Sequence, residues 1–211
     1  DQWRWAEFET DNKKLFRPIP RDRDQVFASY NGFMPRLVAS RFFSREISPF
    51  TYKIHDIVGQ TKQALPLDRR LLNGLEKKAW LEELRFVQKE LTDETIEAAV
   101  REMPEDIFNI SGEEIIAKLK QRRNDLHHYA EAWYEILAEK TDIVLSEKHE
   151  YVLVERKQNG DTEVKAWKRD LDPGKKEKIE QKIYERNFKS GETGEIRIYC
   201  LEGRDSVIIK G

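Results

Sequence analysis

The residues best suited to chemistry lie near the start of the chain, in the run Arg17-Pro-Ile-Pro-Arg-Asp-Arg-Asp-Gln25. Asp22 and Asp24 are separated by one residue, so an extended backbone points both carboxylates to the same side. Converging carboxylates are what an oxygen-rich metal site requires. The three arginines of the same run offer the alternative, a corner of ion pairs. Composition alone favours that corner, because paired carboxylates are frequent in charged proteins.

A second candidate is a basic cluster in a stretch that we expect to be helical. Arg122 and Arg123 are adjacent guanidinium groups, which suit binding of phosphate or of an acidic partner. The alternative is a solvated helix face whose charges pair four residues apart, as Glu114 and Lys118 would.

Other common catalytic and metal patterns are missing from the sequence. Neither a nucleophile elbow nor a phosphate loop nor a dinucleotide fingerprint occurs. The four histidines include no pair spaced to share an ion, and His127 and His128 would point about 100° apart on a helix. We expect structural or solvent-exposed roles for them. Cys200 is the single cysteine and cannot form an intramolecular disulfide.

The elements that position Asp22 and Asp24 are two predicted strands. Residues 3–9 alternate, 11–14 suit a turn, and 15–19 return, which predicts a β-hairpin that ends just before the acidic pair. Prolines in the return strand lack a donor and place it at an edge, or end its pairing at Pro20. A short helix is expected at 35–43, with proline at its first position.

Helical signals dominate from about 68 to 141. Thr92 is expected to cap one helix, which stops before Pro104. Ser111-Gly-Glu-Glu114 matches a capping box, and we expect it to open one long helix that continues through Leu137.

Beyond the helical stretch the hydrophobic period changes to two. Asn159-Gly160 predicts a tight turn, and residues 179–188 alternate as a strand. We expect 196–201 and 207–209 to form a hairpin. These signals predict a C-terminal antiparallel β module.

The whole pattern predicts an α+β fold with an N-terminal β-hairpin, a helical block and that β module. The change of period at 142 is the best candidate for a domain boundary, dividing 1–142 from 143–211. The chain has 211 residues, enough for one large or two small domains. It does not begin with Met, and we expect it to be a domain of a longer protein.

The net charge and the hydropathy of the chain limit the classes of partner that it is expected to bind. Lys and Arg number 38 against 40 for Asp and Glu, so no overall field favours nucleic acid or anionic membrane. No apolar run approaches the roughly 18 residues that span a bilayer, so we expect no direct membrane insertion.

Residues 21–27, Arg-Asp-Arg-Asp-Gln-Val-Phe, resemble the Asp-x-Asp-x-x-Phe part of the metal-binding motif of CotH-type atypical kinases. The resemblance covers about the first thirty residues. It implies that Asp22 coordinates Mg²⁺, that Asp24 is a second or alternative ligand, and that Gln2 stands where the family has a metal-binding Asn. The family's catalytic Asp-Arg-His would lie before residue 1, and the chain has no nucleotide-binding lobe.

Most of the chain also resembles a region of large Gram-negative surface proteins that combine a metallophosphoesterase with a surface-antigen barrel. The segments that carry this likeness are 1–5, 17–25, 122–126 and 192–199, the last reading Glu-Thr-Gly-Glu-Ile-Arg-Ile-Tyr. It implies a place on the periplasmic or cell-surface side of the outer membrane, with the flanking domains of the parent protein as partners. The His/Asp set of a binuclear phosphoesterase is absent from the chain.

Two functions follow as expectations. The favoured one is a non-catalytic structural or interaction module within such an outer-membrane-associated protein. The alternative is the C-terminal half of a CotH-like phosphotransferase, with Mg²⁺ held here and ATP bound only in the full-length parent. The isolated chain is expected to be inactive, and for the parent phosphotransferase and phosphoesterase activity both stay open.

Overall fold

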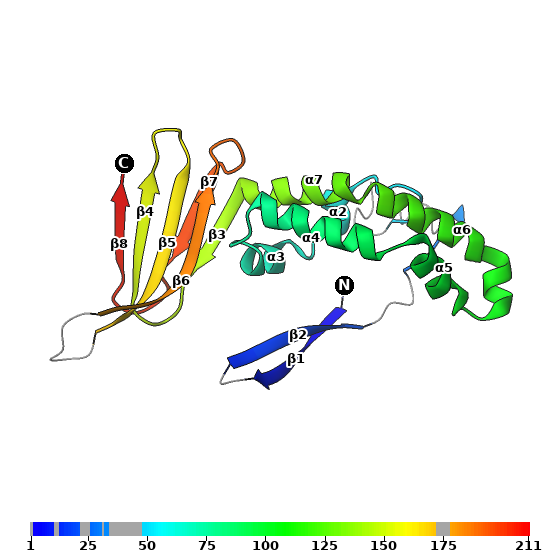
Figure 1. Cartoon of the computed structure of the whole chain (residues 1–211), viewed down its shortest axis with the longest axis horizontal. Helices are drawn as coiled ribbons and strands as arrows, with labels where there is room; N and C mark the ends of the chain where they lie inside the picture. The colour runs from blue at the N-terminus through cyan, green and yellow to red at the C-terminus, as the bar shows by residue number, and fades with distance from the viewer. Residues whose placement is uncertain (1, 11–12, 22–25, 31, 34–47, 172–177) are drawn as a thin grey trace. The chain divides into compact units, whose positions relative to one another are not determined.

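The computed structural model describes residues 2–10, 13–21, 26–30, 32–33, 48–171 and 178–211. The chain forms two compact units. One comprises Asp1–Ala64 with Glu90–Asp125, and the other Leu65–Lys89 with Leu126–Gly211. The predicted α+β class is confirmed (Figure 1). The helix expected at 35–43 lies outside the described residues.

The N-terminal hairpin is confirmed, and it is longer than predicted. β1 (Gln2–Thr10) pairs antiparallel with β2 (Lys13–Arg21), so the strands continue to the pair Thr10 and Lys13. The two prolines of β2 stand opposite Trp3 and Trp5. Because they are two residues apart, both missing donors fall on the same edge of the strand, and the hairpin can pair through the other edge.

The first unit contains α2 (Ile57–Thr61), α5 (Asp93–Arg101) and α6 (Glu105–Asn124). Thr92 caps α5 as predicted, because its side chain accepts a 3.2 Å hydrogen bond from the backbone N–H of Thr95. The helices bury a core made of Phe50, Ile96, Val100, Ile115 and Ile116.

The prediction that Ser111 opens a long helix is wrong. α6 begins at Glu105, directly after Pro104, and two acidic residues in its first turn suit the positive end of the helix dipole. Ser111 therefore lies in the helix interior, where its Oγ donates to the carbonyl of Ile107 at 3.2 Å. The helical stretch also divides at Asp125, after which α7 (Leu126–Glu139) begins.

The helices of the second unit are α3 (Leu65–Leu71), α4 (Lys77–Glu90, of which Glu90 belongs to the first unit) and α7. Two indoles join them. Trp80 Nε1 donates to the carbonyl of Ala130 at 2.9 Å, and Trp133 Nε1 donates to Asp68 Oδ2 at 3.0 Å.

The strands of the second unit form two sheets (Figure 1). β3 (Lys140–Val144) pairs with β7 (Glu195–Tyr199) in parallel. The larger sheet has the order β6-β5-β4-β8. Its members are β6 (Lys178–Phe188), β5 (Thr162–Asp170), β4 (Glu150–Arg156) and β8 (Ser206–Lys210). The core between these strands contains Ile143, Leu145, Val152, Val164, Ala166 and Phe188.

The larger sheet is mixed, which corrects the prediction of a purely antiparallel module. β4, β5 and β6 are antiparallel neighbours, but β8 runs parallel to β4. The expected hairpin between the last two strands is also wrong, since β7 pairs with β3 and β8 with β4. Residue 142, where a domain boundary was expected, lies within β3 inside the second unit.

The turn before β8 explains this direction. The backbone N–H of Arg204 donates to His149 Nδ1 at 2.8 Å, and Asp205 Oδ1 accepts from the N–H of Glu150 at 2.8 Å. Both bonds join the start of β8 to the start of β4, so the two strands leave the same end of the sheet and run parallel.

No helix in the described ranges combines the length and apolar character needed to cross a bilayer.

Replacing Gly203 by Ala should loosen this turn. Gly203 has φ +103°, and a Cβ there would lie 2.2 Å from the carbonyl oxygen of Lys148. We expect a loss of about 1–3 kcal/mol in the free energy of unfolding, measured by denaturant titration. Gly191→Ala is the matched control, because its Cβ would meet nothing within 4 Å. Equal stability of the two variants would contradict this account of the turn.

Candidate functional site

The predicted metal site is only partly within the described residues. Asp22 and Asp24 lie outside them, and for Gln2 the backbone alone is described. Gln2 pairs with Arg21, the residue that precedes Asp22 in the sequence. Among the residues that the structure describes, no three His, Cys, Asp or Glu side chains are grouped to hold a metal.

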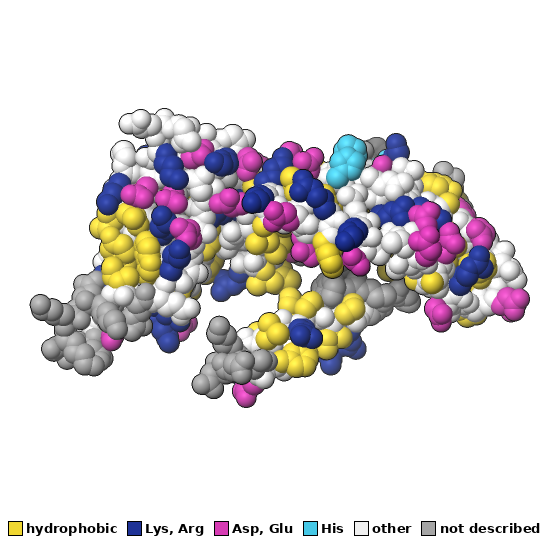
Figure 2. All heavy atoms as spheres, in the orientation of Figure 1, with side chains coloured by type: hydrophobic (Ala, Val, Ile, Leu, Met, Phe, Trp, Pro, Cys, Tyr) yellow, Lys and Arg dark blue, Asp and Glu magenta, His cyan; other side chains and the backbone are white. Residues whose placement is uncertain are grey.

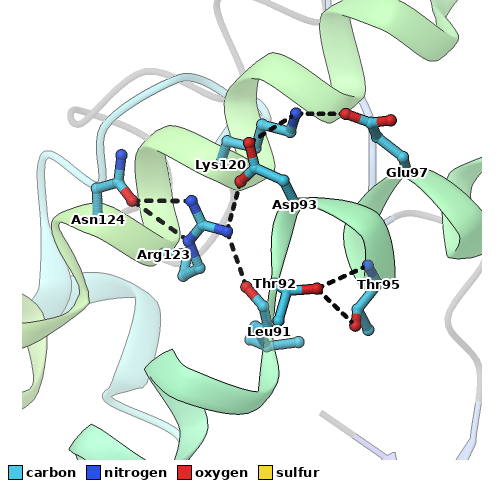
Figure 3. A network of polar contacts seen from close by, with 8 residues as sticks. All are labelled: Leu91, Thr92, Asp93, Thr95, Glu97, Lys120, Arg123 and Asn124. Carbon is cyan, nitrogen blue, oxygen red and sulfur yellow. Dashed lines mark hydrogen bonds and ion pairs between the residues drawn. The ribbon is translucent and has the colours of Figure 1, made fainter.

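The basic cluster of α6 contacts acidic residues of α5 (Figure 3). Arg123 Nη1 donates to Asp93 Oδ1 at 2.7 Å and to the carbonyl of Leu91 at 2.8 Å. Lys120 Nζ lies 3.1 Å from Asp93 Oδ2 and 2.5 Å from Glu97 Oε1. Hydrogen bonds from Arg123 and Lys120 lower the pKa of Asp93, and those to Glu97 and Asp93 raise the pKa of Lys120. The cluster thus joins two helices of the first unit.

Arg122 contacts a different part of that unit. Its Nε donates to the carbonyl of Thr51 at 2.7 Å, and its guanidinium carbon lies 4.2 Å from the ring centroid of Phe50. In these bonds Arg122 and Arg123 contact different groups. Binding of phosphate or of an acidic partner by this pair stays a prediction. The predicted i,i+4 pair is confirmed, with Lys118 Nζ 2.8 Å from Glu114 Oε1.

A groove of about 830 Å³ lies in the first unit. Its walls include Phe27, Phe50, Met103, Ile107 and Ile110, and Ile110 is 81% exposed. This volume is in the range of small-molecule sites, but a binding site also needs a few polar groups that converge on the ligand. Of the polar side chains on the described walls, Glu114 and Lys118 already pair with each other.

The histidines do not form a metal site within the described residues. His149 accepts the hydrogen bond from Arg204 in the turn before β8. The ring centroids of His127 and His128 lie 3.7 Å apart, so the expectation that these adjacent side chains diverge is wrong. Side-chain torsions turn the two rings together although their Cα–Cβ bonds point apart along the helix.

The second unit buries a polar network that the sequence did not reveal. Arg186 is 4% exposed, and its Nη1 donates to the carbonyl of Asn73 at 2.7 Å. Its Nη2 lies 3.5 Å from the hydroxyl of Tyr134, which in turn donates to Glu192 Oε2 at 2.7 Å. Burial raises the pKa of Tyr134 to about 12, so this phenol is neutral near pH 7 and suits a structural donor better than a base.

Asp161 closes the predicted Asn159-Gly160 turn, which is confirmed by the φ of +87° at Gly160. The residue is 6% exposed. Its Oδ2 lies 2.9 Å from Lys189 Nζ, and its Oδ1 accepts from the N–H of Ser190 at 3.2 Å. The hydrogen bond from Lys189, with help from Ser190 and Asn187, lowers the pKa of Asp161 to about 2.

The β8 edge, which we define as the side of β8 away from β4, is apolar. Val207, Ile208 and Ile209 are 44%, 40% and 64% exposed. β8 is the last strand of its sheet, and no described strand pairs with this edge. Figure 2 shows an apolar surface over β4 and β8, at the left of the view.

Both faces of the sheet are apolar at this edge. Val152 pairs with Val207, so Val207 and Ile209 point to the same face as the buried core. Ile208 pairs with Leu153 and points to the opposite face. On that opposite face the rings of Tyr151 and Trp167 lie 5.8 Å apart. Alternation in the sequence predicts the strand, but its place at the edge depends on the strand order, which local sequence does not determine.

No protein-family model, no curated protein and no solved structure matches this chain. The resemblances to CotH-type kinases and to outer-membrane metallophosphoesterases therefore stay predictions.

Asp161→Asn should remove part of the acid sensitivity of the second unit. Because folding lowers the pKa of Asp161 from 3.8 to about 2, its charge stabilises the folded state above pH 4. That contribution is lost as the pH falls from about 4 to about 2. Thermal unfolding between pH 6 and pH 2 should show a steeper fall in Tm for the wild type than for the variant. Parallel profiles would contradict this.

Proposed function

We propose that this chain is a non-catalytic structural and interaction module that binds through the β8 edge. In line with the resemblance, we place it in a large outer-membrane-associated protein of the metallophosphoesterase type, on the periplasmic or cell-surface side. Its partners there would include the flanking domains of that protein.

The observation that carries this proposal is the apolar, exposed β8 edge. An edge strand presents a row of backbone donors and acceptors that another strand can pair with, and natural proteins usually protect such edges with charge or proline. β8 has three consecutive apolar residues instead, Val207 to Ile209. Addition of an extended segment would satisfy the backbone groups and cover apolar side chains on both faces.

The contacts of the charged residues agree with a module that is not catalytic. Arg123 and Lys120 contact Asp93, and Arg186 contacts the Tyr134 hydroxyl and the Asn73 carbonyl. These groups hold elements together within their own units.

A phosphotransferase origin is the second candidate, and the hairpin register favours it. Pairing of Gln2 with Arg21 places Gln2 beside the residue that precedes Asp22, as a shared Mg²⁺ site would need. In this reading Asp22 and Gln2 are ligands and Asp24 is a second carboxylate. The bound ion would supply charge stabilisation, but phosphoryl transfer also needs the nucleotide lobe and catalytic Asp of the full-length parent.

The main proposal predicts that an extended peptide binds the β8 edge. The probe is an eight-residue peptide that alternates valine and threonine, titrated into the full chain. Amide hydrogen exchange of residues 206–210 should slow on binding. The matched control has the same sequence with N-methyl groups on every amide, which removes the donors of both edges of the peptide strand, and it should not protect β8. Protection by neither peptide would contradict strand addition.

The second candidate predicts that Mg²⁺ binds at the end of the hairpin. Calorimetric titration of MgCl₂ should then give a binding isotherm that Asp22→Ala abolishes and that Asp106→Ala, a carboxylate change in α6, leaves intact. Absence of binding, or unchanged binding in Asp22→Ala, would exclude the ligand role of Asp22. Since this experiment does not involve β8, its outcome is independent of the peptide titration.

A further inference from the structure

We propose that the partner of the β8 edge is a second copy of this chain. The two β8 strands would pair antiparallel across a twofold axis at Ile208. This inference rests on the proposed function, because it names the partner of the same edge. The resulting sheet would join two copies of β6-β5-β4-β8 edge to edge.

The residue pattern of β8 is complementary to itself in this register. Ile208 stands opposite Ile208 of the second copy, and Val207 stands opposite Ile209. Ser206 stands opposite Lys210. Apolar cross-strand pairs stabilise a sheet, whereas like charges directly opposite destabilise it. Here every apolar residue meets an apolar residue, and the lysine stands opposite Ser206, whose hydroxyl accepts a hydrogen bond from Arg169 Nη1 at 2.6 Å.

Antiparallel pairings of the two β8 strands in the neighbouring registers have less favourable cross-strand pairs. Moving the axis to Val207 places Lys210 opposite Arg204, a pair of like charges. Moving it to Ile209 places Lys210 opposite Ile208, which loses an apolar pair. The axis at Ile208 avoids both penalties.

The faces of the sheet also match in this arrangement. Directly opposite residues in an antiparallel pair point to the same side. Val207 and Ile209 would therefore extend the core-facing surface of both copies. Ile208 would join the opposite face, which already carries Tyr151 and Leu153.

The other edge of the sheet, β6, is less suited to this role. Lys182 and Glu185 are exposed there and lie within ion-pair distance of each other. Charged side chains on an edge strand oppose pairing with another chain. A twofold contact is closed, so an assembly made through β8 alone ends at two copies.

Cysteine cross-linking tests the register, in a Cys200→Ser background that removes the native thiol. Ile208→Cys would place two thiols on directly opposite residues, and we expect a cross-linked dimer under mild oxidation. Ser206→Cys alone should not cross-link, because residue 206 would stand four residues, about 13 Å, from its own copy along the strand. A mixture of Ser206→Cys and Lys210→Cys chains should cross-link to each other. These two sites are at the ends of β8, so the mixture tests the register even if Ile208→Cys folds poorly.

Sedimentation equilibrium of the wild-type chain is the second measurement. We expect a monomer–dimer equilibrium that Ile208→Asp shifts to monomer. A chain that is monomeric at about 500 μM and yields no mixed cross-link would overturn the second copy as partner. Cross-linking of Ser206→Cys alone as fast as the mixture would overturn the register. If the chain is monomeric but still binds the valine–threonine peptide, the proposed function stands and only this inference fails.

Discussion

The elements of the second unit meet at one buried cation, Arg186, whose two terminal nitrogens are hydrogen-bonded while its Nε has no partner among the described residues. An isolated buried charge is unfavourable by several kcal/mol, so a buried arginine persists only where hydrogen bonds and a counter-charge surround it. Asn73 supplies a carbonyl from the connection between α3 and α4, and Tyr134 supplies a hydroxyl from α7. Glu192, before β7, accepts from that hydroxyl and brings the counter-charge within two hydrogen bonds. These hydrogen bonds connect α7 and the segment between α3 and α4 with β6 of the larger sheet and with the residues before β7 of the smaller sheet. They therefore stabilise the unit to which β8 belongs.

Local sequence predicted those parts of the fold that local physics determines. Alternation and proline placement predicted the hairpin, and a hydroxyl before a helical stretch predicted the Thr92 cap. The capping-box prediction at Ser111 was wrong because the helix is already capped at Pro104, about two turns earlier. The predicted hairpin of the last two strands was wrong. Hydrogen bonds from the turn before β8 to His149 and Glu150 pair β8 with β4 instead. Those partners are distant in sequence, so no local pattern could indicate them.

For the candidate sites too, local sequence predicted some features, and others depended on elements distant in the sequence. Arg122 and Arg123 have the composition of an anion site, but whether such a cluster is open or paired depends on other elements, here Asp93 of α5 and Thr51. The hairpin before Asp22 was predictable from alternation, but its register was not, because the strands continue to the pair Thr10 and Lys13, inside the predicted turn. The apolar β8 edge was not predictable either, because the sequence 206–210 is equally consistent with an interior strand. Only the order of the sheet makes its three apolar side chains a surface.

The most direct test of the central claim, that the β8 edge is where this chain binds, is amide hydrogen exchange of residues 206–210 at two protein concentrations. β4 protects the amides on one side of β8, so the account concerns the amides on the other side. We predict that these exchange rapidly at about 5 μM and are protected at about 500 μM, while exchange in β5, inside the sheet, is the same at both. Equal exchange of β8 at both concentrations, with no added protection from the valine–threonine peptide, would contradict it.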